Sequence, residues 1–539
     1  MSIDLCKGVG KTTVKVLISD KMDSRCVEIL ERNPGIEVDV NTGLSPEELR
    51  SIIGEYAGLI VRSGTKVTSE ILEAADNLRV IGRAGAGVDN IDVEAATRRG
   101  VIVMNTPGGN AVSTAEHSFA MLISLARNIP QANASLKAGK WERGKYIGVE
   151  LAGKTLGILG LGKVGREVAA RAAAFGMKVV GHDPFVSAEM AETFGARLVE
   201  LEELFAVSDF ISVHLPLNDQ TRDMISDDQF ARCKKGVRLI NCARGGIVNE
   251  AALLRALDSE VVAGAALDVF EEEPPTCREL ISCEKVICTP HLGASTREAQ
   301  ASVALQVAEQ VGDALMDRVI RNAVNVPSVE PEVYQKMRPF LDLADRLGRI
   351  LAQISEGQFE RITVEYYGDV TAYPTSPLTS ALLRGLVEKI SDTPVNFVNA
   401  PYFVQERGIR VDELRSTEHE DYANLISVVC RTNVGTRVLS GTIFAKNEPR
   451  LVRLDEYTFD ASPEGHMLFY LNDDRPGIIG YVGTVMGDHR VNIAQMSCGR
   501  QEIGGRALTI LNVDSEIPQQ VIETLLAQDF IAWARQVSV

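Results

Sequence analysis

Short apolar runs alternate with amphipathic stretches along much of this chain. Residues 14–19, 36–40, 58–61 and 80–82 are apolar runs of strand length, and the stretches between them have helical spacing. The same alternation resumes at residue 155 and continues to about residue 269. Strands that alternate with helices form parallel sheets. The pattern therefore predicts an α/β protein that begins with two doubly wound, Rossmann-like domains.

Two other patterns follow residues 325–328, whose composition is typical of a linker. Residues 329–455 combine helices at 341–354 and 377–390 with an alternating strand at 361–367. Residues 466–539 read strand, helix, strand, hairpin, strand, helix, strand, and Gly504 and Gly505 mark the hairpin. We therefore expect an α+β intervening domain and then a ferredoxin-like βαββαβ domain.

Two long helices, at 112–126 and 296–316, are expected to cross between the first two domains. The first domain is then discontinuous, with residues 1–109 and 295–326, and the second spans 110–294. The third and fourth domains are expected at 327–460 and 466–539.

A glycine-rich turn lies between the apolar run 155–159 and a helix expected at 166–175. Gly160 permits the tight turn, Gly162 lets a pyrophosphate approach the backbone, and Gly165 lets the helix pack on its strand. Asp183 ends the next strand, where an acid binds the ribose hydroxyls of NAD and repels the 2′-phosphate of NADP. In this context the motif predicts NAD binding, although a bare glycine motif also occurs in turns that bind nothing.

The composition narrows the range of functions. The net charge of −17 argues against sequence-independent binding to nucleic acid or an anionic membrane. The N-terminus lacks the apolar core of a secretion signal, and the nine cysteines form no C-x-x-C pair. We therefore expect reduced thiols, no metal site and a cytoplasmic location, or a plastid location if a transit peptide has been removed.

Hydride transfer between NAD and a hydroxyl carbon requires a proton acceptor and a cation that holds the substrate. Arg244, Glu273 and His291 lie on strand-end loops of the second domain and could supply both. The loops 62–65 and 82–89, each with an arginine beside glycine, end strands of the first domain and suit an anion. Each residue also has an ordinary structural role open to it: a surface ion pair, a solvated turn or a helix cap.

Several motifs carry a family resemblance. Residues 154–165, 241–250 (NCARGGIVNE), 266–274 (ALDVFEEEP) and 289–296 (TPHLGAST) resemble the D-isomer-specific 2-hydroxyacid dehydrogenases. With 61–67 (VRSGTKV), 82–92 (GRAGAGVDNID), 140–148 (KWERGKYIG) and the two C-terminal domains, the chain from residue 14 resembles the long-form D-3-phosphoglycerate dehydrogenases. In these, the third domain is an allosteric substrate-binding domain and the fourth an ACT domain.

The resemblance implies a role for each matching residue. His291 is the general acid and base, Glu273 is its partner, and Arg244 binds the substrate carboxylate. The implied substrate contacts are Arg62, Ser63, Gly64 and Asn110, with Arg143 reaching the substrate phosphate across a dimer interface. The implied NAD contacts are Gly160, Gly162, Lys163, Val164, Gly165, Asp183, Cys242, Ala243, Asp268, Gly293 and Ala294. Asn472, Asp474 and Asn492 would bind L-serine, across a dimer of ACT domains.

The implied activity is NAD-dependent oxidation of 3-phospho-D-glycerate, the first step of phosphorylated L-serine synthesis, by a homodimer or homotetramer that L-serine inhibits. Ala86 and Leu215 replace the hydroxyl residues that many relatives carry near the cofactor. Three alternatives stay open at this point. They are a hydroxypyruvate, glyoxylate or D-lactate dehydrogenase, a non-enzymatic NADH-sensing co-repressor, and a C-terminal half that only oligomerises.

Overall fold

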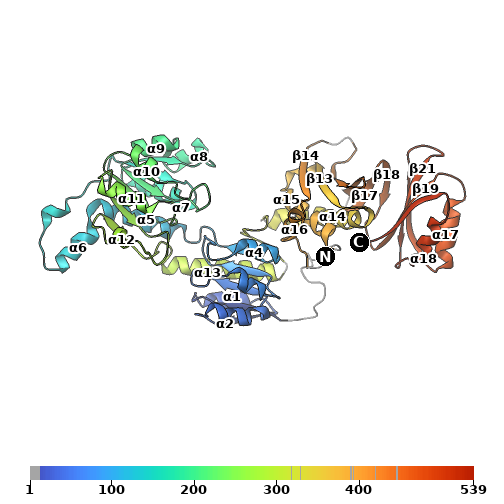
Figure 1. The fold of residues 1–539 in the computed structure, drawn as a ribbon, viewed down its shortest axis with the longest axis horizontal. Coiled ribbons are helices and arrows are strands. Elements are labelled where there is room, and N and C mark those ends of the chain that lie inside the picture. Colours follow the sequence, from blue (N-terminus) through green and yellow to red (C-terminus); the bar gives the residue numbers. More distant parts are fainter. Residues whose placement is uncertain are drawn as a thin grey trace.

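The computed structural model describes residues 13–539 except 317, 328, 330, 389–390, 392–393, 419–420 and 445–446. The first twelve residues of the first expected domain therefore lie outside the described residues. Four sheets follow one another along the chain (Figure 1), and the third and fourth pack together in one hydrophobic core. They confirm the predicted fold class, since two parallel sheets precede a mixed sheet and an antiparallel one.

The first lobe is a five-stranded parallel sheet in the order β2-β1-β3-β4-β5. Its strands are β1 (Val14–Ile18), β2 (Ile36–Val40), β3 (Gly58–Val61), β4 (Val80–Arg83) and β5 (Ile102–Asn105). Its helices are α1 (Arg25–Glu31), α2 (Pro46–Ile52), α3 (Ser69–Glu73), α4 (Val93–Arg98) and α13 (Arg297–Leu315). Val16 packs against α1 and α13, whereas its neighbour Leu17 packs against α2, α3 and α4. The strands are apolar on both faces because helices cover both.

The second lobe is a seven-stranded parallel sheet in the order β12-β11-β10-β9-β6-β7-β8. Its strands are β6 (Thr155–Leu159), β7 (Lys178–His182), β8 (Ala196–Leu198), β9 (Phe210–Val213), β10 (Val237–Asn241), β11 (Val262–Leu267) and β12 (Val286–Cys288). Its helices are α5 (Ala111–Arg127), α6 (Ile129–Lys137), α7 (Lys163–Ala174), α8 (Ala188–Thr193), α9 (Leu201–Val207), α10 (Asp227–Arg232), α11 (Glu250–Asp258) and α12 (Arg278–Ser282). The strand order reverses between β6 and β9, and ligands of open α/β sheets bind at such a switch point.

The third sheet is mixed, with the order β14-β13-β15-β16-β17-β18 and only β13 and β14 parallel. Its strands are β13 (Phe359–Gly368), β14 (Arg410–Ser416), β15 (Asn424–Thr432), β16 (Thr436–Phe444), β17 (Glu448–Leu454) and β18 (Tyr457–Ala461). Its helices are α14 (Pro331–Ile354), α15 (Ser376–Val387) and α16 (Ala400–Glu406). Just before α16, Val398 enters the core of the first lobe, so the third sheet's domain is docked on that lobe.

The fourth sheet is antiparallel, with the order β20-β21-β19-β22. Its strands are β19 (His466–Asp473), β20 (Ile493–Arg500), β21 (Arg506–Val513) and β22 (Ile531–Ser538), and its helices are α17 (Ile478–Asp488) and α18 (Gln519–Leu526). The element order is β-α-β-β-α-β, as predicted from the sequence.

Two helices begin earlier than the sequence pattern suggests. Helix α7 starts at Lys163, so the third glycine of the turn, Gly165, lies in its first helical turn. Helix α14 runs from Pro331 through Pro339, a residue that normally ends a helix. It continues because its buried face, including Met337, Phe340 and Leu343, packs in the core of the third sheet. Within the described ranges, no helix has the length and apolar character that a membrane span requires.

Candidate active site

Three glycines shape the turn between β6 and α7. Gly160 has a φ of 90°, a conformation that favours glycine. A Cβ on Gly165 would lie 2.0 Å from the carbonyl oxygen of Gly160, so a larger residue cannot pack there. Gly162 caps α7, and a Cβ on it would meet open space. The turn therefore leaves room for a pyrophosphate at the N-terminus of α7, where free N–H groups bind anions.

These environments predict different results for two alanine substitutions. Gly165→Ala forces a methyl group against backbone, so we expect the free energy of unfolding to fall by about 1–3 kcal/mol. Gly162 has a φ of −67° that suits alanine, so we expect Gly162→Ala to keep stability within about 0.5 kcal/mol while the Kd of NADH rises about tenfold. Urea unfolding and NADH fluorescence titration measure both quantities. Equal destabilisation by the two variants would contradict this account of the turn.

A pocket of about 490 Å³ opens beside this turn. It is lined by His182, Asp183, Pro184, Leu198, Val199, Glu200 and Glu203. The Asp183 carboxylate accepts hydrogen bonds from the N–H groups of Leu161 (2.8 Å) and Phe185 (2.9 Å), which fix it at the end of β7. Because three carboxylates line the pocket, it fits the adenosine of NAD and disfavours the 2′-phosphate of NADP.

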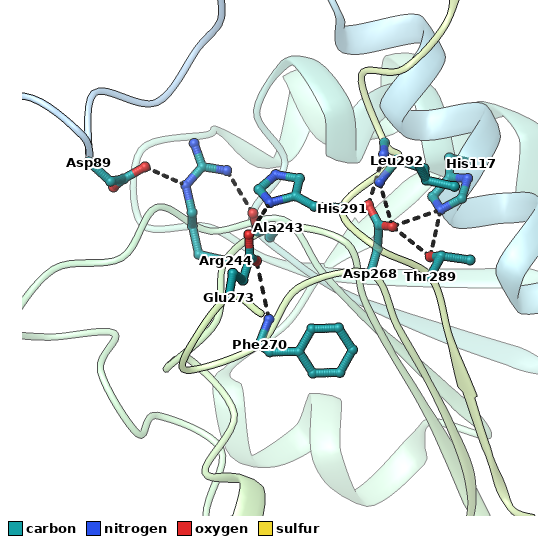
Figure 2. A network of polar contacts seen from close by, with 11 residues as sticks. Asp89, His117, Ala243, Arg244, Asp268, Phe270, Glu273, Thr289, His291 and Leu292 are labelled. Carbon is teal, nitrogen blue, oxygen red and sulfur yellow. Dashed lines mark hydrogen bonds and ion pairs between the residues drawn. The ribbon is translucent and has the colours of Figure 1, made fainter. Parts of the chain in front are cut away.

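His291 and Glu273 form a hydrogen-bonded pair (Figure 2). Nδ1 of His291 lies 2.7 Å from Oε2 of Glu273, and Oε1 of Glu273 accepts a hydrogen bond from the N–H of Phe270 at 3.3 Å. The hydrogen bond to Glu273 raises the pKa of His291, against the opposing effects of burial and of nearby Arg244. A histidine paired in this way can accept and donate a proton near neutral pH.

The pairing predicts a shift in the pH profile. Because Glu273 is the main cause of the raised pKa of His291, Glu273→Gln should lower that pKa. His291 must be neutral to accept a proton during alcohol oxidation, so the acidic limb of kcat/KM should move to lower pH. During ketone reduction His291 must be protonated, so the basic limb should also move to lower pH. The exposed neighbour Glu272 provides the control, Glu272→Gln, and an equal shift in both variants would contradict the pairing.

Asp268, buried just after β11, anchors the loop that carries His291 (Figure 2). Its carboxylate accepts hydrogen bonds from the Thr289 hydroxyl (2.5 Å) and from the N–H groups of Leu292 (2.7 Å) and Gly293 (2.8 Å). The N–H of His291 donates to its main-chain oxygen at 2.9 Å. His291 has a φ of 53°, which costs a residue other than glycine about 1–2 kcal/mol. The hydrogen bonds to Asp268 offset this cost and fix the imidazole.

His117 on α5 joins the same network. Its Nε2 lies 3.2 Å from Oδ1 of Asp268 and 3.2 Å from Oγ1 of Thr289. In the described part of the chain, His117, Cys242 and Asp268 are the only side chains of metal-binding type close enough to share an ion. Burial raises the pKa of Cys242 to about 12, so this thiol is neutral, and both carboxylate oxygens of Asp268 already accept hydrogen bonds. The group therefore ties helix α5 to the loop that carries His291.

Arg244 follows β10 and reaches across to the first lobe. Its Nε donates to Oδ2 of Asp89 at 3.1 Å, and its Nη1 donates to the carbonyl oxygen of Ala243 at 2.7 Å (Figure 2). The side-chain amide of Asn241 braces the turn by donating to the main-chain oxygen of Arg244 at 2.9 Å. A Cβ on Gly87 would lie 2.0 Å from Nη2 of Arg244, so the glycine loop of the first lobe makes room for the guanidinium.

The loop after β3 carries the predicted substrate residues Arg62, Ser63 and Gly64. Asp20 shapes this loop, because its carboxylate accepts the N–H groups of Arg62 (2.6 Å) and Thr65 (3.1 Å). A Cβ on Gly64 would lie 2.6 Å from Oδ1 of Asp20. The loop therefore holds Arg62 at the carboxyl edge of the sheet, where open α/β sheets bind ligands.

The hinge at the start of α5 meets the cofactor turn. Asn110 precedes α5, and its carbonyl oxygen accepts the hydroxyl of Ser113 at 3.0 Å. Nζ of Lys163, in the first turn of α7, donates to the carbonyl oxygen of Pro107 at 2.8 Å. Val164 packs against the core beneath the turn. Lys163, a predicted cofactor residue, thus contacts the loop that leads to Asn110.

Arg143 lies apart from the other predicted substrate residues of its own chain. It begins a 3-10 turn (η2, Arg143–Tyr146) after α6, which projects from the second lobe (Figure 1) and buries none of its residues. On this arm Trp141 is 75% exposed and Ile147 is 81% exposed. Among the described residues, no contact brings Arg143 to Arg244 or Arg62 of the same chain.

The predicted serine residues lie at two ends of the fourth sheet. Asn472 and Asp474 lie at the end of β19, where Asp474 accepts hydrogen bonds from Arg500 (2.9 Å) and the N–H of Gly504 (3.2 Å). Asn492 precedes β20 at the other end and donates to Asp514 at 2.7 Å. One chain therefore does not bring all three together, and a shared site needs Asn492 from a second chain.

The sequence analysis did not assign roles to Asp20, Asp89, His117 or Thr289. Asp89 and Thr289 lie inside motifs that it quoted, but their partners come from the opposite lobe or from α5. Asp20 and His117 carry no local pattern that separates them from surface residues. Only their contacts in the folded structure identify these four residues.

Three family models match the chain. Residues 119–293 match the NAD binding domain of D-isomer specific 2-hydroxyacid dehydrogenases, 336–455 match the D-3-phosphoglycerate dehydrogenase intervening domain, and 466–530 match the ACT domain. With the histidine–glutamate pair and Arg244 beside an NAD fold, they define an NAD-dependent dehydrogenase of the 2-hydroxyacid class.

Full-length relatives specify the family further. The D-3-phosphoglycerate dehydrogenase of Synechocystis is 44% identical over 95% of this chain and 93% of its own. That of Archaeoglobus fulgidus is 44% identical over 98% of this chain and 100% of its own. The chain belongs to the family of D-3-phosphoglycerate dehydrogenases.

Solved structures resemble the first two lobes. A glyoxylate reductase from Paecilomyes thermophila is 32% identical, with a TM-score of 0.54 over 58% of this chain and 98% of its own. The D-lactate dehydrogenase of Aquifex aeolicus, solved with NAD and lactic acid, is 27% identical, with a TM-score of 0.52 over 58% of this chain and 100% of its own. The NAD fold of this chain is therefore shared with enzymes of several 2-hydroxy acids.

Proposed function

We propose that this protein oxidises 3-phospho-D-glycerate to 3-phosphohydroxypyruvate with NAD. The observation that carries the proposal is that Arg244 lies near the His291–Glu273 pair and also contacts Asp89 of the first lobe. Arg62 follows strand β3 of that lobe. The substrate bears a carboxylate and a phosphate, and arginine side chains bind both groups through charge-assisted hydrogen bonds. The relatives that match along nearly the whole chain carry the name of this activity.

In the proposed reaction, Arg244 binds the substrate carboxylate and polarises the oxygen on C2. His291 accepts the proton of the C2 hydroxyl, and Glu273 stabilises the resulting imidazolium. NAD, when bound, accepts the hydride that leaves C2. In the reverse direction the protonated His291 returns its proton to the carbonyl oxygen.

We assign cofactor contacts to two groups of residues. The glycine turn and Asp183 bind the pyrophosphate and ribose, and the loops around Arg244 and His291 face the nicotinamide. The assigned residues are Gly160, Gly162, Lys163, Val164, Gly165, Asp183, Cys242, Ala243, Asp268, Gly293 and Ala294. Substrate contacts are assigned to Arg62, Ser63, Gly64 and Asn110.

We propose that two chains pair through the arm that carries α6. Its exposed Trp141 and Ile147 would be covered in such a dimer. Arg143 would then bind the substrate phosphate in the partner's cleft, which it does not reach in its own chain. The oligomer is accordingly a homodimer or a homotetramer built from it.

We further propose that the reaction supplies phosphorylated L-serine synthesis and that L-serine inhibits it. Asn472 and Asp474 of one ACT domain and Asn492 of another would bind the effector. Titrating NADH oxidation with L-serine, for the full chain and for Asp474→Ala, tests this. Insensitivity of the full chain to serine would favour a purely structural role for the fourth domain.

A cytoplasmic location, or a plastid one, stays a prediction.

The first test compares NADH oxidation with 3-phosphohydroxypyruvate and with hydroxypyruvate. We expect a kcat/KM at least about a hundredfold higher for the phosphorylated ketoacid, because its phosphate adds charge-assisted hydrogen bonds. Equal rates would reduce the assignment to a general 2-hydroxyacid dehydrogenase. Absence of turnover with either ketoacid, despite NADH binding, would favour the sensor alternative.

A further inference from the structure

Arg83 ends strand β4 at the same edge of the first sheet as Arg62. The register pairs Arg83 with Val61, the last residue of β3, so the two arginines end neighbouring strands. The Arg83 side chain then folds back over Gly85, where a Cβ would lie 1.9 Å from its Nη1 and 2.9 Å from its Cζ. Glycine at position 85 is what makes room for this guanidinium.

The Arg83 guanidinium has no counter-ion in the described part of the chain. Its Nε is buried there without a hydrogen-bond partner. The two neighbouring carboxylates are engaged elsewhere: Asp89 pairs with Arg244, and Asp20 accepts the backbone N–H groups of Arg62 and Thr65. A half-buried cation without a partner is unfavourable, and such an arrangement is typical of a group that a ligand completes.

The charges around Arg83 make its unpaired guanidinium still less favourable. Burial, and then the charges of Arg244 and Arg62, lower the pKa of Arg83 to about 10, while Asp89 and Asp20 oppose the shift. Even so, Arg83 stays protonated at neutral pH. The charges of Arg244 and Arg62 therefore both repel the Arg83 guanidinium, and an anion bound beside it would relieve this repulsion.

Arg83 and Arg244 come from different lobes but lie against the same short loop. Gly85 makes room for Arg83, and Gly87 makes room for Arg244. Since Arg244 is the proposed ligand of the substrate carboxylate, an anion bound there lies close to Arg83. A guanidinium presents a planar set of donors that matches the oxygens of either a carboxylate or a phosphate.

We propose that Arg83 is a further substrate-binding residue, which donates to an oxyanion of the substrate from the first lobe while Arg244 donates from the second. The proposal rests on the proposed function, since it requires a substrate with anionic groups. It adds to the arginines at positions 62, 143 and 244 a cation with no competing protein partner among the described residues.

The test compares wild type, Arg83→Gln and Arg83→Lys in steady-state kinetics and in NADH titration. With the phosphorylated ketoacid as substrate, we expect Arg83→Gln to raise KM about 10- to 100-fold, with the Kd of NADH unchanged and Arg83→Lys intermediate. The same KM comparison with hydroxypyruvate, which has no phosphate, shows which oxyanion of the substrate Arg83 binds. A rise in KM for both ketoacids assigns Arg83 to the carboxylate, and a rise for the phosphorylated one alone assigns it to the phosphate.

Arg99→Gln is a matched control, because Arg99 is an arginine of the same lobe that pairs with Asp76 at 3.1 Å beyond the end of α4. The thermal unfolding temperature of each variant shows whether a change in KM reflects lost substrate binding or a destabilised fold. Because the ligand-free protein leaves Arg83 without a counter-ion among its described residues, Arg83→Gln should unfold at the same or a higher temperature than wild type. An unchanged KM for both ketoacids, with or without a lower unfolding temperature, would overturn the inference. Wild type that fails to reduce 3-phosphohydroxypyruvate would overturn the proposed function instead.

Discussion

Replacing His291 with glutamine is expected to lower kcat by a factor of about 10²–10⁴, which is the usual contribution of a positioned general acid and base. The amide keeps the size and polarity of the side chain but cannot carry the proton. Because the cofactor turn lies in another loop, the Kd of NADH should change little. Steady-state kinetics in both directions and NADH fluorescence titration measure the two effects.

His489→Gln is the matched control, because this histidine caps α17 in the fourth domain and lies outside both proposed sites. It should keep the wild-type kcat. A His291→Gln enzyme with more than about a tenth of the wild-type kcat would contradict the assignment of His291 as proton carrier. An equal loss of NADH affinity would mean that the loop, and not the proton, is disturbed.

Replacing Arg244 with glutamine is expected to lower kcat/KM by about 10²–10³, the typical cost of removing one donor that stabilises developing charge. The neutral amide can neither neutralise the substrate carboxylate nor polarise the C2 oxygen to the same degree. Arg244→Lys should recover part of the activity, because it restores the charge but not the planar pair of donors. Steady-state kinetics with the phosphorylated ketoacid give the size of the loss.

Arg244 also bonds to Asp89, so the substitution breaks an interlobe ion pair as well as a substrate contact. Asp89→Asn separates the two effects, because it removes the charge of the partner and leaves the guanidinium. The pair is exposed on the Asp89 side, so we expect Asp89→Asn to change kcat/KM by less than about tenfold. If Asp89→Asn were as damaging as Arg244→Gln, the ion pair and not the carboxylate contact would explain the loss.

Alternation of apolar runs and helical stretches was enough to predict the fold class, because each strand buried on two faces must be apolar along its length. The same pattern failed at the start of α14. There the sequence contains Pro339, and only the packing of Met337, Phe340 and Leu343 in the third core shows that the helix continues. Propensity is local, whereas the packing energy that overrides it comes from distant segments.

The sequence by itself determined that the second domain binds NAD, because Gly160, Gly162, Gly165 and Asp183 lie in one β-α-β unit whose geometry follows from residue spacing. The individual cofactor contacts stay a prediction. It could not decide between catalytic and structural roles for Arg244, Glu273 and His291, which lie on three separate loops. Only the tertiary structure set the His291–Glu273 hydrogen bond, the Asp268 network and the contact of Arg244 with Asp89. It also showed that Nε of Arg83 lacks a partner among the described residues, which no spacing rule can reveal. Hydrogen bonds and charge pairs act over a few ångströms in space, so residues far apart in sequence become a site only after the chain has folded.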